Sequence, residues 1–204
     1  MVNYIYEQRF WKKGIEYVAG VDEAGRGPLA GPVVAAAVMF RPGDWIDGVD
    51  DSKKLSPSQR EVMFQLIRER ALGIGIASVS HTVIDKVNIL KATMRAMAQA
   101  VSKLHPSPRH LLVDGPRYDT KTIPYTPIVD GDAKCFSIAA ASIVAKVTRD
   151  RLMAEFDKKF PQYGFAQHKG YATQEHRDAI LRFGPCEIHR RSFRMPNVVN
   201  INDP

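Results

Sequence analysis

The sequence has little cysteine and no long apolar run. Only Cys135 and Cys186 occur among its 204 residues, with no CxxC pair. This excludes a disulfide-stapled scaffold and a zinc ribbon, and it favours a reducing compartment. The longest apolar stretches, residues 28–40 and 138–145, are shorter than the roughly 18 residues that a membrane span needs. The first 14 residues lack the apolar centre of a signal peptide, so we expect a cytoplasmic protein without membrane association.

Internal repeats, biased tracts and linkers are also absent, which excludes fibrous and disordered classes. Hydrophobic residues make up 45% of the chain and charged residues 25%. At roughly 100–200 residues per domain, this length predicts one domain over residues 1–204. A chain of this size can bury enough surface to fold without metals or disulfides.

Positive charge is in excess and is distributed unevenly. The chain has 29 Lys and Arg against 22 Asp and Glu, a net charge of +7. Residues 1–145 carry 18 basic and 15 acidic side chains, whereas residues 146–195 carry 11 and 6. A clustered positive region attracts polyanions, nucleic acid first among them. Charge alone is equally compatible with ordinary solvated helix faces.

Apolar runs bounded by Gly and Pro predict strands, and apolar residues at helical spacing predict helices. The predicted strands are residues 17–21, 33–40, 73–79, 110–113 and a short one at 128–129. The predicted helices are residues 57–72, 89–104, 137–160 and 174–183. Strands followed by alternating helices indicate an α/β fold with a mixed central sheet.

Two of the helices carry further signals. Ser56 precedes a proline and stands three residues before Gln59, which predicts a capping box. In that helix we expect Val62, Leu66 and Ile67 to face the core. In the long helix, Lys146, Arg149 and Arg151 are expected on the surface. Thr173 is the predicted cap of the last helix.

Acidic residues stand at the ends of predicted strands. Asp22 and Glu23 follow the first strand, Asp114 follows the fourth, and Asp132 precedes the long apolar helix. Ligand sites form at strand ends in α/β sheets. Gathered carboxylates repel one another unless cations offset their charge, and oxygen-only ligands suit Mg²⁺ or Mn²⁺. Two such ions fit phosphodiester hydrolysis. The competing interpretation is that the Asp-Gly pairs at 114 and 130 are simple turns.

The segment Gly25-Arg26-Gly27 follows Glu23 closely. With Ala30 it formally matches a dinucleotide-binding fingerprint, but that motif must open a helix. Here the chain leads through prolines into another strand, so the dinucleotide interpretation fails. A tight loop remains, with Arg26 available to a phosphate, or alternatively a purely structural turn.

Several long blocks then match a known family in order. They are residues 20–29 (GVDEAGRGPL), 51–56 (DSKKLS), 113–115 (VDG), 131–132 (GD), 140–150 (AASIVAKVTRD), 160–165 (FPQYGF), 168–171 (HKGY) and 189–193 (HRRSF). Together they resemble bacterial ribonuclease HII, the type 2 ribonuclease H family. The resemblance covers about residues 17–193 and leaves residues 194–204 as a tail.

The resemblance implies a ribonuclease H-like fold, with a central mixed sheet flanked by helices and a short helical C-terminal region. It implies metal-dependent hydrolysis of the RNA strand of RNA–DNA hybrids, and cleavage 5′ of ribonucleotides embedded in duplex DNA. The implied products have 3′-hydroxyl and 5′-phosphate ends, formed with two Mg²⁺ or Mn²⁺ ions. A monomer acting in ribonucleotide excision repair is expected.

The resemblance also assigns residues. The implied catalytic and metal-binding carboxylates are Asp22, Glu23, Asp114 and Asp132. Gly25, Arg26 and Gly27 match the loop that senses the 2′-hydroxyl, and Tyr171 matches the tyrosine that stacks on the next deoxyribose. A 2′-hydroxyl is the mark that separates RNA from DNA at one nucleotide, so a close backbone loop can read it. The expected phosphate contacts are Lys53, Lys54, Lys146 and Arg149.

One position departs from the family pattern: Asp130 stands where lysine is more frequent. An added carboxylate is expected to alter metal affinity or weaken phosphate binding nearby, and we take Asp132 as the ligand. Two other functions stay open. One is a different metal nuclease, such as a proofreading exonuclease or an integrase-like enzyme, and the other is a non-catalytic nucleic-acid-binding module. A serine or cysteine hydrolase is poorly supported, and His168 and His189 are expected to support structure or phosphates.

Overall fold

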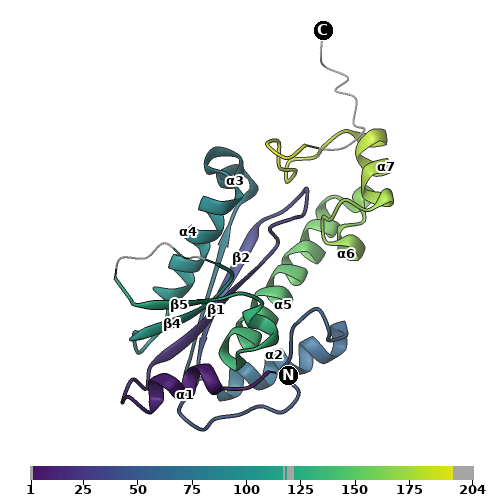
Figure 1. The fold of residues 1–204 in the computed structure, drawn as a ribbon. Coiled ribbons are helices and arrows are strands. Elements are labelled where there is room, and N and C mark those ends of the chain that lie inside the picture. The colour runs from purple at the N-terminus through teal and green to yellow at the C-terminus, as the bar shows by residue number, and fades with distance from the viewer. Residues whose placement is uncertain (1, 117, 119–121, 195–204) are drawn as a thin grey trace.

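A five-stranded sheet with the order β3-β2-β1-β4-β5 forms the centre of the computed structural model (Figure 1). The structure describes residues 2–116, 118 and 122–194. The strands are β1 (Val18–Ala24), β2 (Val33–Met39), β3 (Gly73–Val79), β4 (His110–Asp114) and β5 (Tyr125–Ile128). The first three pair antiparallel, whereas β4 lies parallel to both β1 and β5. The predicted α/β class with a mixed sheet is confirmed.

Seven α-helices occur in the described residues. They are α1 (Ile5–Trp11), α2 (Pro57–Arg70), α3 (His81–Val87), α4 (Ile89–Val101), α5 (Phe136–Lys159), α6 (Phe165–His168) and α7 (Gln174–Phe183), with short 3₁₀ turns η1 (Gly131–Ala133) and η2 (Pro161–Tyr163). The four predicted helices are present, and the capping box of Ser56 with Gln59 is formed. Thr173 accepts a hydrogen bond from the backbone N–H of His176, as its cap role predicts.

Strand β2 is buried along its whole length because helices cover both faces of the sheet. Ala35, Ala37 and Met39 pack on the side of α3 and α4. Ala36 and Val38 point the other way and pack on the side of α2 and α5. Figure 1 shows these two layers on either side of the strands. Burial on both faces explains why this strand reads as a continuous apolar run.

Helix α5 approaches β1 so closely that only glycine fits at position 20. A Cβ atom on Gly20 would lie 2.1 Å from the carbonyl carbon of Ser137. Ser137 stands in the first turn of α5, and Gly20 lies two residues before Asp22. The absence of a side chain therefore lets the start of α5 sit beside the acidic end of β1.

A smaller C-terminal part packs on the far half of α5. Its apolar core joins Met153 of α5 to Phe165, Ile180 and Ile188, and to Leu29 from the loop after β1. Figure 1 shows α6 and α7 at this end of the long helix, away from α1. The predicted helical C-terminal region is thus confirmed. Of the predicted tail, residues 195–204 lie outside the described residues.

Two local predictions are wrong. Val62 is 56% exposed because the inward face of α2 runs through Phe64 and Ile67. Asp22 and Glu23 lie within β1, because pairing with β2 continues to Ala24. In the described part of the chain, no helix has the length and apolar character to span a membrane.

Candidate active site

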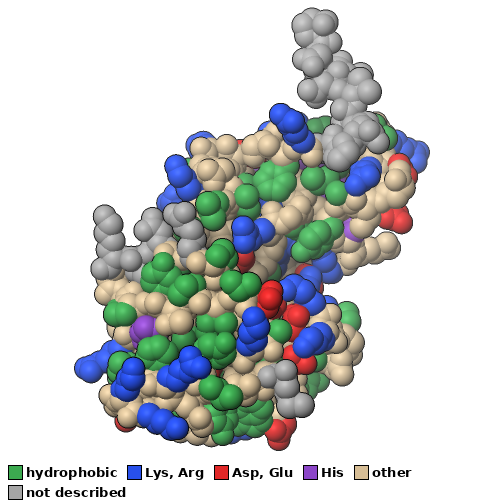
Figure 2. Space-filling view, viewed as in Figure 1, with side chains coloured by type: hydrophobic (Ala, Val, Ile, Leu, Met, Phe, Trp, Pro, Cys, Tyr) green, Lys and Arg blue, Asp and Glu red, His purple; other side chains and the backbone are tan. Residues whose placement is uncertain are grey.

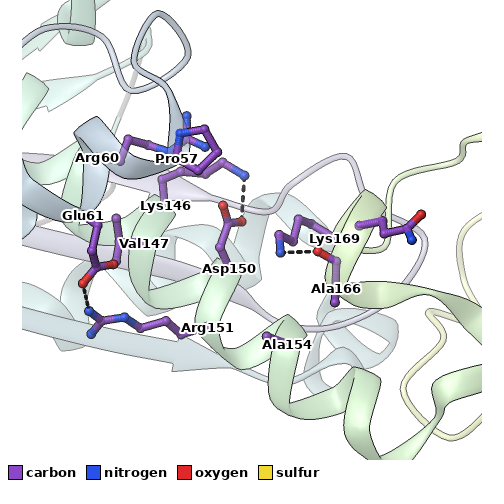
Figure 3. Close-up of a pocket in the computed structure, with 11 residues that line it drawn as sticks. Pro57, Arg60, Glu61, Lys146, Val147, Asp150, Arg151, Ala154, Ala166 and Lys169 are labelled. Atoms are coloured by element: carbon purple, nitrogen blue, oxygen red, sulfur yellow. Dashed lines mark hydrogen bonds and ion pairs between the residues drawn. The ribbon is translucent and has the colours of Figure 1, made fainter.

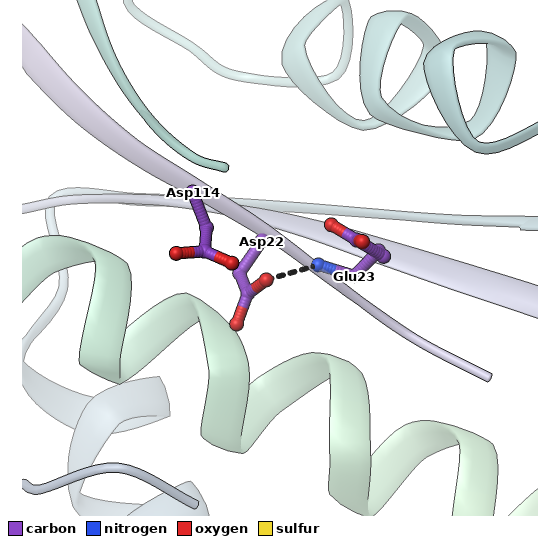
Figure 4. Close-up of side chains that lie close together, drawn as sticks. All are labelled: Asp22, Glu23 and Asp114. Carbon is purple, nitrogen blue, oxygen red and sulfur yellow. Dashed lines mark hydrogen bonds between the residues drawn. The ribbon is translucent and has the colours of Figure 1, made fainter. Parts of the chain in front are cut away.

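Three carboxylates meet where the parallel pairing of β1 and β4 ends. Asp22 and Glu23 come from β1, and Asp114 is the last residue of β4. One carboxylate oxygen from each residue lies within 4.8 Å of the others (Figure 4). Val21 pairs with Val113 across these strands, so the residues that follow are brought to the same edge. This is the gathering of acidic side chains that the strand ends predict.

Asp132 reaches the same cavity from the turn before α5. It is buried, and it lines the cavity together with Asp22, Glu23 and Asp114. Its Oδ2 accepts a hydrogen bond of 2.8 Å from Nζ of Lys53. The structure therefore brings the four predicted carboxylates into one pocket, with three in mutual ligand range and the fourth held by a lysine.

Backbone groups fix the orientation of these carboxylates. Oδ1 of Asp22 accepts from the N–H of Glu23 at 2.7 Å. Oδ1 of Asp114 accepts from the N–H of Gly131 at 2.7 Å, which ties the end of β4 to the turn that carries Asp132. Because these donors belong to the main chain, the fold itself sets the orientation of Asp22 and Asp114.

Asp130 has a different environment from Asp132. Its backbone is left-handed, with φ of 54°, and its side chain is 76% exposed with Lys134 at 3.8 Å. Asp132 is the aspartate of this segment that lines the cavity. The effect of Asp130 on metal affinity stays a prediction.

Burial makes negative charge costly at this site. It raises the pKa of Asp22 well above its ordinary value, and repulsion from Glu23 and Asp114 adds to the effect. Burial also raises the pKa of Glu23, opposed by Arg26, whose Nη1 donates to Glu23 Oε1 at 3.1 Å. The pKa of Asp114 is raised by burial as well. An all-oxygen donor set whose charge is unfavourable on its own fits a hard divalent cation.

The predicted junction-sensing residues face one another at the mouth of this cavity. Gly25, Arg26, Gly27 and Tyr171 all line it. Gly25 has a left-handed φ of 96°, and a Cβ on Gly27 would lie 3.8 Å from Cε1 of Tyr171. The ring of Tyr171 is accessible, since the residue is 45% exposed. The loop leads into β2 and not into a helix, which confirms that it is no dinucleotide-binding turn.

Two of the three predicted lysines line the cavity, namely Lys53 and Lys146. Nζ of Lys146 lies 2.7 Å from Asp150 on the next turn of α5. Lys54 pairs instead with Asp50 at 3.1 Å on the exposed surface nearby. Figure 2 shows Lys and Arg side chains directly beside Asp and Glu side chains near the middle of the face of the molecule that it displays.

The expectation that Arg149 lies on the surface is wrong. The residue is 1% exposed, and its guanidinium donates to the backbone carbonyls of Ala30, Pro32 and Lys169. It therefore offers no surface to a phosphate. Helical spacing placed Arg149 near Lys146 but could not reveal that this face of α5 is covered by the loop after β1.

A neighbouring groove lies between α2, α5 and α6 and shares Lys146 with the cavity (Figure 3). Arg151 forms an ion pair there with Glu61. Arg60 donates from Nη1 to the carbonyl oxygens of Ser52 at 2.9 Å and Leu55 at 2.6 Å. Arg60 thus holds the segment that carries Lys53, a role that sequence reasoning missed.

Comparisons with known proteins agree with this arrangement. The family model described as Ribonuclease HII matches residues 19–195. A curated Ribonuclease HII from Ruminiclostridium cellulolyticum is 56% identical over 188 residues, which cover 92% of this chain and 74% of that protein.

Two solved structures are also similar to this chain. One is the ribonuclease H2 of Pyrococcus horikoshii, with a TM-score of 0.73 and 29% identity over 87% of this chain and 94% of that one. The other is RNase HII of Archaeoglobus fulgidus in complex with PCNA, with a TM-score of 0.74 and 28% identity over 92% of this chain and 97% of that one.

Proposed function

This chain belongs to the ribonuclease HII family and is therefore a ribonuclease H that acts on RNA–DNA hybrids, and we propose that it also cuts 5′ of single ribonucleotides embedded in duplex DNA. The observation that carries this proposal is one cavity in which Asp22, Glu23 and Asp114 face the Gly25–Gly27 loop and Tyr171. A carboxylate cluster able to hold metal ions, placed next to a close-fitting loop and an exposed ring, would join cleavage chemistry to sugar recognition.

Asp22, Glu23, Asp114 and Asp132 would hold the divalent ions, Mg²⁺ or Mn²⁺. Two bound ions would activate water and stabilise the leaving oxygen, giving 3′-hydroxyl and 5′-phosphate ends. The chain itself orients Asp22 and Asp114 through the N–H groups of Glu23 and Gly131, and Asp132 through Lys53.

Recognition of the sugar belongs to the loop and the tyrosine. Gly25 and Gly27 line the cavity without side chains, so the backbone of the loop can approach a 2′-hydroxyl. Tyr171 would stack on the following sugar, where its ring would clash with an added hydroxyl and so favour deoxyribose. Lys53 and Lys146 line the same cavity and would contact phosphates, with Lys54 adding positive charge nearby.

The remaining features of the proposal concern the molecule as a whole. We infer a single domain over residues 1–204 that works as a monomer in the cytoplasm, with nucleic acid as its partner. The positive charge of residues 146–195 supports binding of a polyanion beside the acidic cavity.

A closed circular DNA with one embedded ribonucleotide tests the function. With Mg²⁺ or Mn²⁺, the protein is expected to nick this circle on the 5′ side of the ribonucleotide and to leave an all-DNA circle intact. A proofreading exonuclease needs a free end and would cut neither circle. A pure binding module would retain the circle without product even after long incubation, and either result would refute the proposal.

A further inference from the structure

Two arginines are buried behind the Gly25–Gly27 loop without an acidic partner. Arg149 is 1% exposed and Arg190 is 0% exposed. Neither forms an ion pair with a carboxylate of the described residues. A buried charge of this kind is costly unless hydrogen bonds satisfy it, so the contacts of these two guanidiniums explain their presence.

Arg190 uses all of its guanidinium nitrogens, two on the loop and one on the residues that follow it. Nη2 donates to the carbonyl oxygen of Gly25 at 2.6 Å and Nη1 to that of Arg26 at 2.9 Å. Nε donates to the carbonyl oxygen of Gly31 at 2.9 Å. The carbon of the guanidinium lies 5.0 Å from the ring centre of Phe193, which adds a cation–π contact.

Arg149 joins residues 30–32, which follow the loop, to the segment that carries Tyr171. Its Nε and Nη2 donate to the carbonyls of Pro32 and Ala30 at 3.0 and 3.2 Å. Its Nη1 donates to the carbonyl of Lys169 at 3.0 Å, two residues before the tyrosine.

Direct backbone contacts close this network. The N–H of Leu29 donates to the carbonyl of Gly170 at 2.8 Å, and the carbonyl of Leu29 accepts from the N–H of Arg190 at 2.8 Å. A Cβ on Gly170 would lie 2.7 Å from the carbonyl oxygen of Ala30. Leu29 and Ala30, which follow the loop, are therefore in contact with the tyrosine segment, with no room for another side chain between them.

The direction of the carbonyls sets the direction of the amides. In a trans peptide unit the C=O and the following N–H point in opposite directions. Because Arg190 draws the carbonyls of Gly25 and Arg26 inward, the N–H groups of Arg26 and Gly27 point away from it. Neither N–H donates a backbone hydrogen bond to another described residue, and residues 25–27 line the cavity. These two donors are thus available to a ligand.

We propose that Arg149 and Arg190 are positioning residues that set the spacing between the Gly25–Gly27 loop and Tyr171 and so determine the selectivity for a ribonucleotide followed by deoxyribose. The inference rests on the proposed roles of that loop and that ring. It assigns a specificity function to two residues that touch neither the metal-binding carboxylates nor an exposed surface.

Arg190→Lys is the sharpest test, because lysine keeps the charge but cannot reach three carbonyls in the fork geometry of a guanidinium. The readout is kcat/KM on duplex DNA with one ribonucleotide, divided by kcat/KM on a continuous RNA–DNA hybrid. We expect this ratio to fall roughly tenfold or more, since small misplacements of a positioning group are costly. Binding of Mn²⁺, measured by calorimetry, is expected to stay unchanged. Arg191→Lys, at the exposed neighbouring residue, is the matched control.

Further variants separate positioning from general loss of structure. Arg149→Lys and Gly170→Ala both disturb the contact between residues 29–32 and the tyrosine segment. Both are expected to lower the ratio of kcat/KM on single-ribonucleotide DNA to kcat/KM on the hybrid. Thermal unfolding checks that each variant is folded. In a double-mutant cycle, Arg190→Lys is expected to cost little selectivity once Tyr171 has been replaced by alanine.

The outcomes distinguish this inference from the proposed function. If the wild-type protein cuts neither substrate, the proposed function fails. If the wild type cuts both and the folded variants lose activity on both equally, or lose none, the positioning role is refuted.

Discussion

Lys53 places Nζ 2.8 Å from Oδ2 of Asp132, inside the cavity that also holds Asp22 and Glu23. The hydrogen bond with Asp132 raises the pKa of Lys53 above its ordinary value, so the lysine stays charged at neutral pH. A side-chain cation therefore already offsets part of the negative charge at the place where a divalent ion would bind. Lys53 would therefore compete with a divalent ion for Asp132.

Replacing Lys53 by methionine is expected to separate metal binding from cleavage. Without the competing ammonium, Mn²⁺ should bind more tightly by roughly threefold to tenfold, because one nearby positive charge is removed. Cleavage should nevertheless slow by roughly tenfold, because a phosphate contact is lost. Calorimetry with Mn²⁺ and single-turnover cleavage measure the two effects. Lys54→Met, which removes a lysine paired with Asp50, is the control, and weaker Mn²⁺ binding in Lys53→Met would contradict the competition.

Asp22→Asn is expected to abolish cleavage while preserving the fold. The pKa of this carboxyl is raised well above normal by burial and by its acidic neighbours, so its charged form destabilises the metal-free protein. Asparagine removes that charge, and the free energy of unfolding without metal should rise by about 1 kcal/mol. Denaturant unfolding and cleavage assays test this pair of effects, with the exposed Asp178→Asn as control. Full cleavage by Asp22→Asn would exclude Asp22 as a metal ligand.

Tyr171→Ala should lower cleavage of single-ribonucleotide DNA without weakening metal binding. The ring is exposed and lines the cavity, and the carboxylates of Asp22 and Asp114 are held by other contacts. Removing the ring should lower cleavage of single-ribonucleotide DNA by roughly tenfold, the value of one lost stacking contact. Mn²⁺ affinity should be unchanged, and Tyr171→Phe, which keeps the ring, should behave like wild type. Equal cleavage of this DNA by the alanine variant would rule out the stacking role.

Two buried histidines are expected to make stability depend on pH. His176 and His189 are in contact, with 3.1 Å between their Nε2 atoms, and burial lowers the pKa of each to about 4. The unfolded chain, with ordinary histidine pKa values near 6.5, takes up these protons more readily. The stability that the neutral pair provides is therefore complete above about pH 6.5 and is lost as the pH falls toward 4.

His176→Asn should remove part of this dependence. The raised pKa of Asp22 acts in the opposite direction, because its contribution to the free energy of unfolding is lost as the pH rises. The informative quantity is therefore the difference in the free energy of unfolding between the variant and the wild type. Between pH 7 and pH 5, the wild type should lose about 2 kcal/mol more than the variant. Denaturant unfolding at both values measures it, with the exposed His105→Asn as control. If the free energy of unfolding changed equally with pH in wild type and His176→Asn, the buried pair would not titrate between pH 5 and pH 7.

The order of strands and helices could be predicted because it depends on local signals. The capping box at Ser56 and the all-apolar start of α5 are properties of short segments, and both appear where expected. The carboxylates at strand ends could also be predicted to meet, since parallel strands end at a common edge. The short helices α1 and α3 were missed because their apolar pattern is too short to show a period.

What the sequence by itself determined is the kind of site: acidic residues next to predicted strands, a glycine loop and an excess of positive charge, with a tyrosine added by the family resemblance. Tertiary structure alone decided which basic side chains line the cavity and which are buried behind it. Arg149 and Lys146 stand one helical turn apart, yet Arg149 is buried under the loop after β1 and Lys146 lines the cavity. The spacing of residues along a helix shows which of them share a face. Whether another segment covers that face depends on packing between parts of the chain that are distant in sequence.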